Sequence, residues 1–169
     1  MLIGITGTPG TGKTSVAEEL RRRGIAVLDL KTTVEPYIIG VEDDSSVVDT
    51  DVWVDAQVRS GIDGYVEGSL AHYLPCDKLI ILRCRPDVLL KRLQPRKYSE
   101  SKTNENVDAE ALDVILIEAV ELLDAEKIFE IDTTNTDIEK TADLIQAFAE
   151  DKLPAAFGSI DWSEYVMSL

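Results

Sequence analysis

Residues 7–14 read GTPGTGKT, and the rest of the chain is organised around them. They carry glycine, glycine, lysine and threonine at the fixed positions of the phosphate-binding pattern G-x-x-x-x-G-K-[ST]. The apolar run before them, residues 1–6, predicts a strand, and residues 15–23 predict a helix with Val16 and Leu20 on one face. A glycine loop between a strand and a helix is the context that this pattern requires. The stretch therefore predicts a phosphate loop at the first turn of an α/β sheet.

The chemistry of this loop depends on its glycines and on Lys13 and Thr14. Gly7, Gly10 and Gly12 allow the backbone to turn tightly and to point its N–H groups inward, where the start of the helix adds the positive end of its dipole. Lys13 is placed to reach the β- and γ-phosphates of a nucleotide, and the Thr14 hydroxyl to bind Mg²⁺. A glycine-rich turn that binds nothing is the alternative, but such a turn would not need Lys13 and Thr14 at these positions.

Length and composition indicate one soluble globular unit, a single domain over residues 1–169. Hydrophobic residues make up 44% and charged residues 29%, which is ordinary for such a protein. No apolar run approaches the roughly 18 residues of a membrane helix, and the first residues are already needed as a strand, so neither a membrane anchor nor a signal peptide is expected. With only Cys76 and Cys84, the simple interpretation is a cytoplasmic protein with reduced thiols.

The net charge of −15 restricts the possible partners. A surface this acidic repels a nucleic-acid backbone, so duplex DNA or RNA is not expected to bind directly. Solubility alone, adaptation to high salt or a basic protein partner would each account for the charge.

Strands and helices alternate along the chain. Further strands are expected at 25–30, 64–67, 78–83 and 127–131, and further helices at 51–60, 86–93, 99–124 and 137–150. The pattern is weak from 31 to 59, where helical pieces and a loop are expected, and residues 154–169 are expected to form a tail with Trp162 and Tyr165 against the body. The alternation predicts a parallel sheet with helices on both faces and a ligand site at the carboxyl ends of its strands.

Glu67 ends the expected strand at 64–67 and is the candidate for a second Mg²⁺ ligand. In nucleoside-triphosphate enzymes an acid at the end of a neighbouring strand holds the ion, directly or through water. Strand ends also carry acids without any such role, and the phosphate loop upstream favours the metal interpretation. Asp29 and Asp49 are the alternative acids. His72, the single histidine, is expected to be structural.

Residues 92–98, RLQPRKY, form a short basic patch in an acidic chain. Arginines stabilise a moving phosphoryl group with fork-shaped, charge-assisted hydrogen bonds. Arg96 and Arg92 of this patch, together with Arg83, are therefore candidates for a catalytic or phosphate-positioning role. A solvated basic turn is the alternative interpretation.

Taken as a whole, the chain resembles the archaeal and eukaryotic adenylate kinase family that is also linked to ribosome assembly, the nuclear adenylate kinase type. The matching segments cover most of the chain: GTPGTGKT at 7–14, VVDTD at 47–51, EGSLAHYLP at 67–75, LRCRPDVLLKRL at 82–93, RKYSESKTNENVDAEALDVI at 96–115 and GSIDWSEYV at 158–166. The block from 82 to 115 is far more specific than the phosphate loop.

The resemblance implies a P-loop NTPase fold with five parallel strands in the order 2-3-1-4-5. It implies transfer of the ATP γ-phosphate to AMP to give two ADP, with Mg²⁺ as cofactor, a segment for the nucleoside monophosphate near 30–52 and a short lid near 95–105. The residues implied to hold ATP are Gly10, Gly12, Lys13, Thr14 and Ser15, with Arg96 reaching the phosphates from the lid. In eukaryotes the family joins a small-subunit ribosomal protein and acts as an ATPase in rRNA maturation, so a basic ribosomal protein is an implied partner.

Two positions depart from the family pattern. The family usually has histidine two residues after the acid of the 64–67 strand, where this chain has Ser69, and this change predicts weak ATP hydrolysis. The lid usually reads Arg-Gly-Tyr, and here it reads Arg96-Lys97-Tyr98, which predicts a stiffer lid turn.

Two other function classes stay open at this stage. One is a P-loop kinase that acts on a different small molecule. The other is an assembly factor whose ATP cycle remodels a ribosomal protein, with kinase activity secondary. A GTPase is disfavoured because the chain has no Asn-Lys-x-Asp motif for reading a guanine base.

Overall fold

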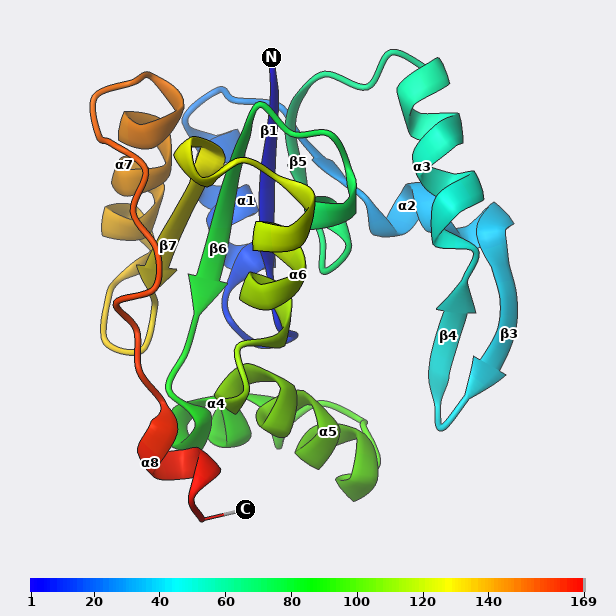
Figure 1. The fold of residues 1–169 in the computed structure, drawn as a ribbon, viewed down its shortest axis with the longest axis vertical. Helices are drawn as coiled ribbons and strands as arrows, with labels where there is room; N and C mark the ends of the chain where they lie inside the picture. The colour runs from blue at the N-terminus through cyan, green and yellow to red at the C-terminus, as the bar shows by residue number, and fades with distance from the viewer. Residues whose placement is uncertain (169) are drawn as a thin grey trace.

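The structure, a computed structural model that describes residues 1–168, is built around one five-stranded parallel sheet (Figure 1). Its strands are β1 (Leu2–Gly7), β2 (Val27–Asp29), β5 (Gly64–Glu67), β6 (Lys78–Arg83) and β7 (Ile128–Asp132), and they lie in the order β2-β5-β1-β6-β7. Counted along the chain within this sheet alone, that order is 2-3-1-4-5. The expected α/β fold with a five-stranded parallel sheet is confirmed.

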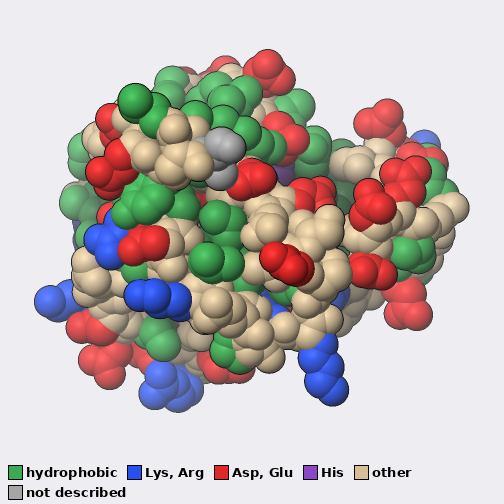
Figure 2. Space-filling view, turned by 90° about the horizontal axis from the view of Figure 1, so that it is seen from below, with side chains coloured by type: hydrophobic (Ala, Val, Ile, Leu, Met, Phe, Trp, Pro, Cys, Tyr) green, Lys and Arg blue, Asp and Glu red, His purple; other side chains and the backbone are tan. Residues whose placement is uncertain are grey.

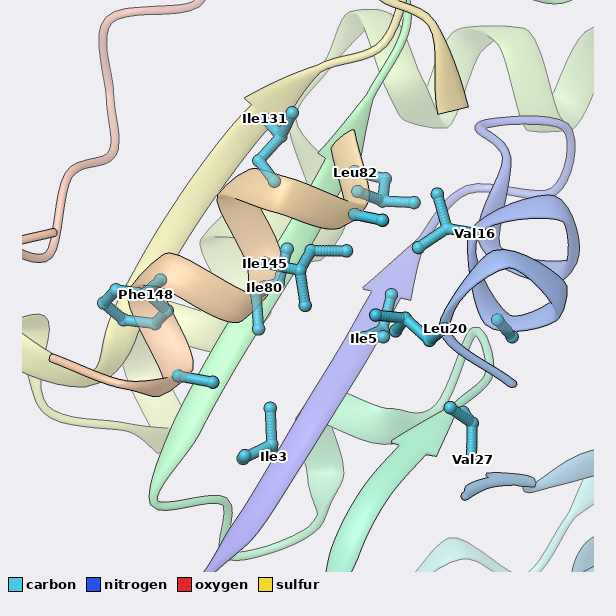
Figure 3. Packing of buried hydrophobic residues seen from close by; sticks show 13 residues of the cluster. Ile3, Ile5, Val16, Leu20, Val27, Ile80, Leu82, Ile131, Ile145 and Phe148 are labelled. Carbon is cyan, nitrogen blue, oxygen red and sulfur yellow. The ribbon is translucent and has the colours of Figure 1, made fainter. Parts of the chain in front are cut away.

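Helices cover both faces of the sheet, so its strands bury side chains on both sides. On one face, α1 (Lys13–Arg22) and α7 (Ile138–Ala149) pack on Ile3 and Ile5 of β1 and on Ile80 and Leu82 of β6 (Figure 3). On the other face, α3 (Thr50–Arg59) and α6 (Val114–Leu122) contribute buried side chains to a second cluster with Leu79 and Ile81 of β6. This alternation along β6 fixes the register of the central strands.

The segment from 31 to 49 contains an antiparallel hairpin that the sequence did not predict. After α2 (Lys31–Val34) and the 3₁₀ turn η1 (Glu35–Tyr37), strand β3 (Ile38–Glu42) pairs with β4 (Ser45–Val48). Asp43 and Asp44 between them have φ angles of 45° and 62°, the backbone of a two-residue turn in which both central residues are left-handed. The usual sequence signal for such a turn places glycine second, so Asp-Asp concealed it. The hairpin extends away from the sheet on the right of Figure 1.

The expected helix at 99–124 is wrong as one element, because the structure has two. They are α5 (Glu100–Ala111) and α6, and the chain breaks between them at Leu112 and Asp113. Asp113 has a φ of 56°, a left-handed conformation that Asp tolerates better than most residues. Its carboxylate is paired with the guanidinium of Arg83, and this ion pair fixes the junction between the two helices to the end of β6.

The other expected strands and helices are confirmed to within two residues. Asp49 accepts the N–H of Val52 and caps α3, Pro86 opens α4 (Pro86–Leu93), and Asp137 caps α7. Short turns complete the set: η2 (Ala71–Tyr73), η3 (Ala125–Lys127) and α8 (Ser163–Val166). Among residues 1–168, none of the helices has both the length and the apolar character needed to cross a bilayer.

The segment that follows α7 packs against the body, as expected. Ala156 exchanges backbone hydrogen bonds with β7, accepting from Glu130 and donating to Ile128. Trp162 is buried, and its ring lies edge-on to that of Tyr165. The segment thereby covers the β7 edge of the sheet.

Candidate active site

A cavity of about 1140 Å³ opens at the carboxyl ends of the sheet strands. Its floor is formed by residues 9–16, which comprise most of the phosphate loop and the first turn of α1. One wall is formed by α2 and the hairpin, and the opposite side by residues 92–98 and the segment from β7 to α7. The predicted position of the ligand site, beyond the strand ends, agrees with this cavity.

Two glycines shape the floor. Gly10 has a φ of 92°, and a Cβ there would lie 2.8 Å from Leu89 and 2.9 Å from Leu93 of α4, so the loop packs directly on that helix. Gly12 has a φ of 107° and is the N-cap of α1, so only a residue without a Cβ enters the helix at this angle without strain. Both glycines line the cavity at the N-terminus of α1, the position at which backbone N–H groups bind phosphate.

Lys13 folds back over its own loop. Its ammonium donates hydrogen bonds to the carbonyl oxygens of Gly7 (2.7 Å) and Thr8 (3.1 Å). Burial lowers the pKa of Lys13 to about 8, and the nearby Glu67 and Glu110 carboxylates oppose that change. An anionic ligand bound beside Lys13 would therefore stabilise its charged form. Thr14 and Ser15 also line the cavity.

Glu67 and Asp29 lie next to each other where β5 and β2 end. Both line the cavity, and Glu67 is only 5% exposed. Burial, and then the neighbouring Asp29 carboxylate, raise the pKa of Glu67. Asp29 accepts the N–H of Lys31 at 2.9 Å, whereas Asp49 serves as the N-cap of α3. Of the three acids considered from the sequence, Glu67 is the most buried beside the loop.

The donors fit a magnesium ion that is shared with a nucleotide. Within residues 1–168 no group of three His, Cys, Asp or Glu side chains is arranged to hold a metal ion. Mg²⁺ keeps several waters and commonly takes one or two protein oxygens plus substrate phosphates. The hydroxyl of Thr14 and the carboxylate of Glu67, both on the cavity lining, match that requirement.

The three candidate arginines separate into two groups. Arg92 and Arg96 line the cavity, and Arg92 donates to the backbone oxygen of Thr133 at 2.7 Å. Arg83 is different, because its guanidinium is 2% exposed and is bound to the carboxylates of Glu110, Asp113 and Glu130. These ion pairs occupy the guanidinium of Arg83, so of the three candidates only Arg92 and Arg96 are placed to contact a phosphate in the cavity.

His72 is a hydrogen-bonded structural residue, as expected. It is 1% exposed, with Nδ1 3.2 Å from the Thr6 hydroxyl and Nε2 2.7 Å from a Glu118 carboxylate oxygen. Burial lowers its pKa. Ser69 lies on the cavity lining three residues earlier, so His72 does not replace the histidine that the family pattern has at position 69.

Sequence reasoning missed several residues of the lining. The hairpin contributes Ile38, Ser46 and Val48, which lie within the expected 30–52 segment but were not named singly. The turn after β7 contributes Thr133, whose hydroxyl donates to the Thr11 oxygen at 2.7 Å. No local pattern marks these residues. Only the fold brings the turn after β7, some 120 positions away, to the phosphate loop.

A family model described as an AAA domain matches residues 3–113, which include the phosphate loop, Glu67 and the basic patch. The chain belongs to this AAA domain family.

Relatives in the family cover nearly the whole chain. A protein of Archaeoglobus fulgidus named "Putative adenylate kinase" is 44% identical, with 96% of this chain and 92% of the relative aligned. Proteins with the same name from Methanosarcina barkeri and Natronomonas pharaonis are 42% and 37% identical, and each alignment covers 98% of this chain and 100% of the relative. The resemblance to archaeal adenylate-kinase-type proteins is therefore confirmed, and the link to ribosome assembly stays a prediction.

Solved structures share the fold at low identity. Deoxyadenosine kinase from M. mycoides, solved with products bound, has a TM-score of 0.57 and 15% identity, and the match covers 89% of this chain and 100% of that one. A sugar kinase from Janibacter sp. HTCC2649 has a TM-score of 0.54 and 16% identity, covering 88% and 94%. These matches support the α/β architecture around the phosphate loop.

Proposed function

We propose that this protein is a nucleoside monophosphate kinase that transfers the γ-phosphate of ATP to AMP and so produces two ADP. The observation that carries the proposal is the cavity, whose lining includes the phosphate loop, Glu67 and Arg96. At about 1140 Å³ it exceeds the 300–1,000 Å³ typical of a pocket for one drug-sized ligand. A second nucleotide beside ATP accounts for that size, and the names of the archaeal relatives support AMP as that nucleotide.

The floor of the cavity is assigned to ATP. The backbone N–H groups from Gly10 to Ser15 would bind the phosphate oxygens, and Lys13 would exchange its two carbonyl partners for the β- and γ-phosphates. Thr14 and Glu67 would hold Mg²⁺, which neutralises charge on the phosphate oxygens when it is bound. These residues would position the donor and stabilise the charge of the transferring group. Catalysis of phosphoryl transfer consists almost entirely of these two effects.

The wall formed by α2 and the hairpin is assigned to AMP. Residues 30–52 contribute α2 and the hairpin to this wall, including Lys31, Val48 and Thr50 on the lining. The segment near 95–105 is assigned as the lid, with Arg96 and Tyr98 facing the same space. An acceptor held between these parts would present its phosphate to the γ-phosphate in line, the geometry that converts a bimolecular step into an effectively unimolecular one.

A panel of phosphate acceptors tests this assignment. With MgATP fixed, ADP formation would be measured with AMP, with the other nucleoside monophosphates, with deoxyadenosine, with a simple sugar and with water alone. The proposal expects AMP to give the highest kcat/KM. A nucleoside or sugar that surpasses AMP would replace the proposal with a P-loop kinase of a different small molecule.

Arg96→Lys is expected to lower kcat for transfer by about 10- to 100-fold, because a hydrogen bond to a charged group contributes about 1.5–3 kcal/mol and an ammonium lacks the bidentate fork. The measurement is steady-state transfer from MgATP to AMP. Arg59→Lys is the matched control, since Arg59 is an exposed arginine of α3 paired with Asp55 and should keep full activity. Full activity in Arg96→Lys would remove Arg96 from the mechanism.

Ser69→His is expected to raise ATP hydrolysis without AMP by about tenfold or more, because a positioned imidazole can accept a proton from water, an effect that contributes up to 10²–10⁴. Transfer to AMP should change much less, since it does not require a group to orient water. Ser69→Gln is the control, because glutamine has similar size and no titratable nitrogen. Brisk hydrolysis by the native protein, unchanged in Ser69→His, would contradict this account of position 69.

A second candidate function is an ATP-dependent role in small-subunit ribosome maturation, which is implied by the family resemblance and which the acidic surface favours. The net charge is −15, and acidic side chains are spread over the face in Figure 2, including the lobe on its right. A purified basic small-subunit ribosomal protein should bind, and more weakly as salt rises, because exposed charges are screened within about 8 Å at physiological ionic strength. Absence of binding at every salt concentration would dismiss this role.

A further inference from the structure

Thr8 occupies a position of the phosphate-binding pattern at which no particular side chain is required. In this structure its hydroxyl donates a 2.7 Å hydrogen bond to Oε2 of Glu110 in α5. Thr8 and Glu110 are each 3% exposed, so the contact is shielded from water. A hydrogen bond to an ionised carboxylate is about twice as strong as a neutral one. The loop is thus tied to a helix that lies about a hundred positions further along the chain.

Glu110 is itself held from several sides. Its second oxygen, Oε1, accepts from Nε of Arg83 at 2.8 Å and from the N–H of Cys84 at 3.1 Å, and its backbone oxygen accepts from Arg83 at 3.2 Å. Arg83 is fixed in turn by the carboxylates of Asp113 and Glu130. The carboxylate that Thr8 meets is therefore anchored to the end of β6, to the α5–α6 break and to β7.

On the loop side, Thr8 is where several contacts converge. Its backbone oxygen accepts from the N–H of Thr11 at 3.2 Å, from the Thr11 hydroxyl at 2.8 Å and from the ammonium of Lys13 at 3.1 Å. A displacement of Thr8 would move the acceptor of Lys13 and the turn that carries Gly10. The side-chain contact with Glu110 thus controls the part of the loop that carries the phosphate-binding groups.

We propose that Glu110 is a positioning residue for phosphoryl transfer, which acts by fixing the phosphate loop through the hydroxyl of Thr8. The proposal rests on the function assigned above and adds a residue that touches neither nucleotide. Because α5 begins at Glu100, inside the proposed lid segment near 95–105, one helix carries part of the lid at its start and the loop anchor near its end. The anchor limits the loop to the geometry in which N–H groups and Lys13 meet the phosphates, and a 1 Å misplacement of such groups can cost about 10²-fold in rate.

The test removes the hydroxyl and leaves the buried ion pairs intact. Thr8→Val is nearly isosteric and keeps the Arg83–Glu110 pair, whereas removing Glu110 would take away one of the three carboxylates that hold Arg83 in the interior. Thr8→Val is expected to lower kcat about tenfold or more, with the KM for ATP changed by less than about threefold, because misplacement affects the transition state more than ground-state binding. Thr8→Ser retains the hydroxyl and should stay near wild type.

A double-mutant cycle with Glu110→Gln assigns the effect to this contact. In the Glu110→Gln background, Thr8→Val should have little further effect on kcat, because the two changes weaken the same hydrogen bond. Full additivity of the two losses would overturn the proposal. A kcat for Thr8→Val within twofold of wild type would also overturn it, as would equal losses in Thr8→Val and Thr8→Ser.

Hydrogen exchange of the loop amides separates this inference from the assigned function. In nucleotide-free protein, the amide of Thr11, which donates to the Thr8 oxygen at 3.2 Å, should exchange about tenfold faster in Thr8→Val than in wild type, and at the wild-type rate in Thr8→Ser. If the wild-type protein does not phosphorylate AMP, the assigned function is wrong. The exchange rate of this loop amide then still shows whether Glu110 positions the loop. Unchanged exchange overturns the positioning role, and so does faster exchange with unchanged kcat.

Discussion

Lys13→Ala is expected to reduce transfer from MgATP to AMP by at least about 10³-fold, because a cation aimed at the transferring phosphoryl group contributes about 10³–10⁵ in comparable enzymes. The fold should survive the change. In the free protein the ammonium contacts the carbonyl oxygens of Gly7 and Thr8, and Thr8 keeps the hydrogen bonds it accepts from Thr11. Burial already disfavours this charge, as the lowered pKa of about 8 shows, so its removal relieves a desolvation cost.

The measurement pairs turnover with thermal unfolding. Lys91→Ala is the matched control, since Lys91 is an exposed lysine of α4 that does not line the cavity. Lys13→Ala should lose turnover and unfold within a few degrees of wild type, a shift of about 1 kcal/mol or less for a chain of this size. Turnover within about tenfold of wild type would contradict the assignment of the loop.

Glu67→Gln is expected to lower activity by about 10²–10³-fold, the loss typical when one group that stabilises transition-state charge is removed. The amide keeps the shape of the side chain but is a poorer ligand for Mg²⁺, which prefers charged oxygens. Nucleotide binding without metal should stay near wild type. Stability should be unchanged or higher at neutral pH, because burial and Asp29 raise the pKa of Glu67 and so make its ionised form unfavourable in the folded state.

A magnesium titration of activity measures this effect, with nucleotide affinity determined with and without the metal. Asp29→Asn and Asp49→Asn are the matched controls, since the first removes the neighbouring acid in the lining and the second removes only the charge of the α3 cap, where asparagine still accepts the Val52 N–H. Wild-type magnesium dependence in Glu67→Gln would move the metal role to another acid, and a larger loss in Asp29→Asn would identify that acid as Asp29.

Much of the architecture was readable from local pattern. The phosphate loop, the strand ending at Glu67 and the buried strand at 78–83 each carry their signal within a few residues, and a parallel sheet brings their carboxyl ends together. The strand order came from the resemblance to adenylate kinases and not from the local pattern. The two main errors of the sequence analysis were the missed hairpin at 38–48 and the single helix expected at 99–124. Both arise at turns, since Asp43-Asp44 and Asp113 adopt a left-handed backbone without the glycine that marks such turns.

The rest of the candidate site depends on contacts between distant residues. Arg83 ends a strand and Arg92 and Arg96 belong to a basic patch, but the pairing of Arg83 with Glu110 and Glu130, which separates it from the other two, cannot be predicted from the sequence. Thr8 stands at a variable position of its motif, and nothing nearby in the sequence indicates Glu110 as its partner. Such pairings are set by how α5 packs under the loop, which neither hydrophobic period nor motif spacing encodes.

The most direct test of AMP as the phosphate acceptor is the amount of ADP formed from MgATP with AMP present and with AMP absent. With AMP present, two ADP should form rapidly for each ATP consumed, one ADP from the donor and one from the acceptor. Without AMP, ADP should form slowly, at one per ATP and with release of inorganic phosphate. Equal rates in the two conditions, with one ADP per ATP in each, would contradict the central claim that AMP is the phosphate acceptor.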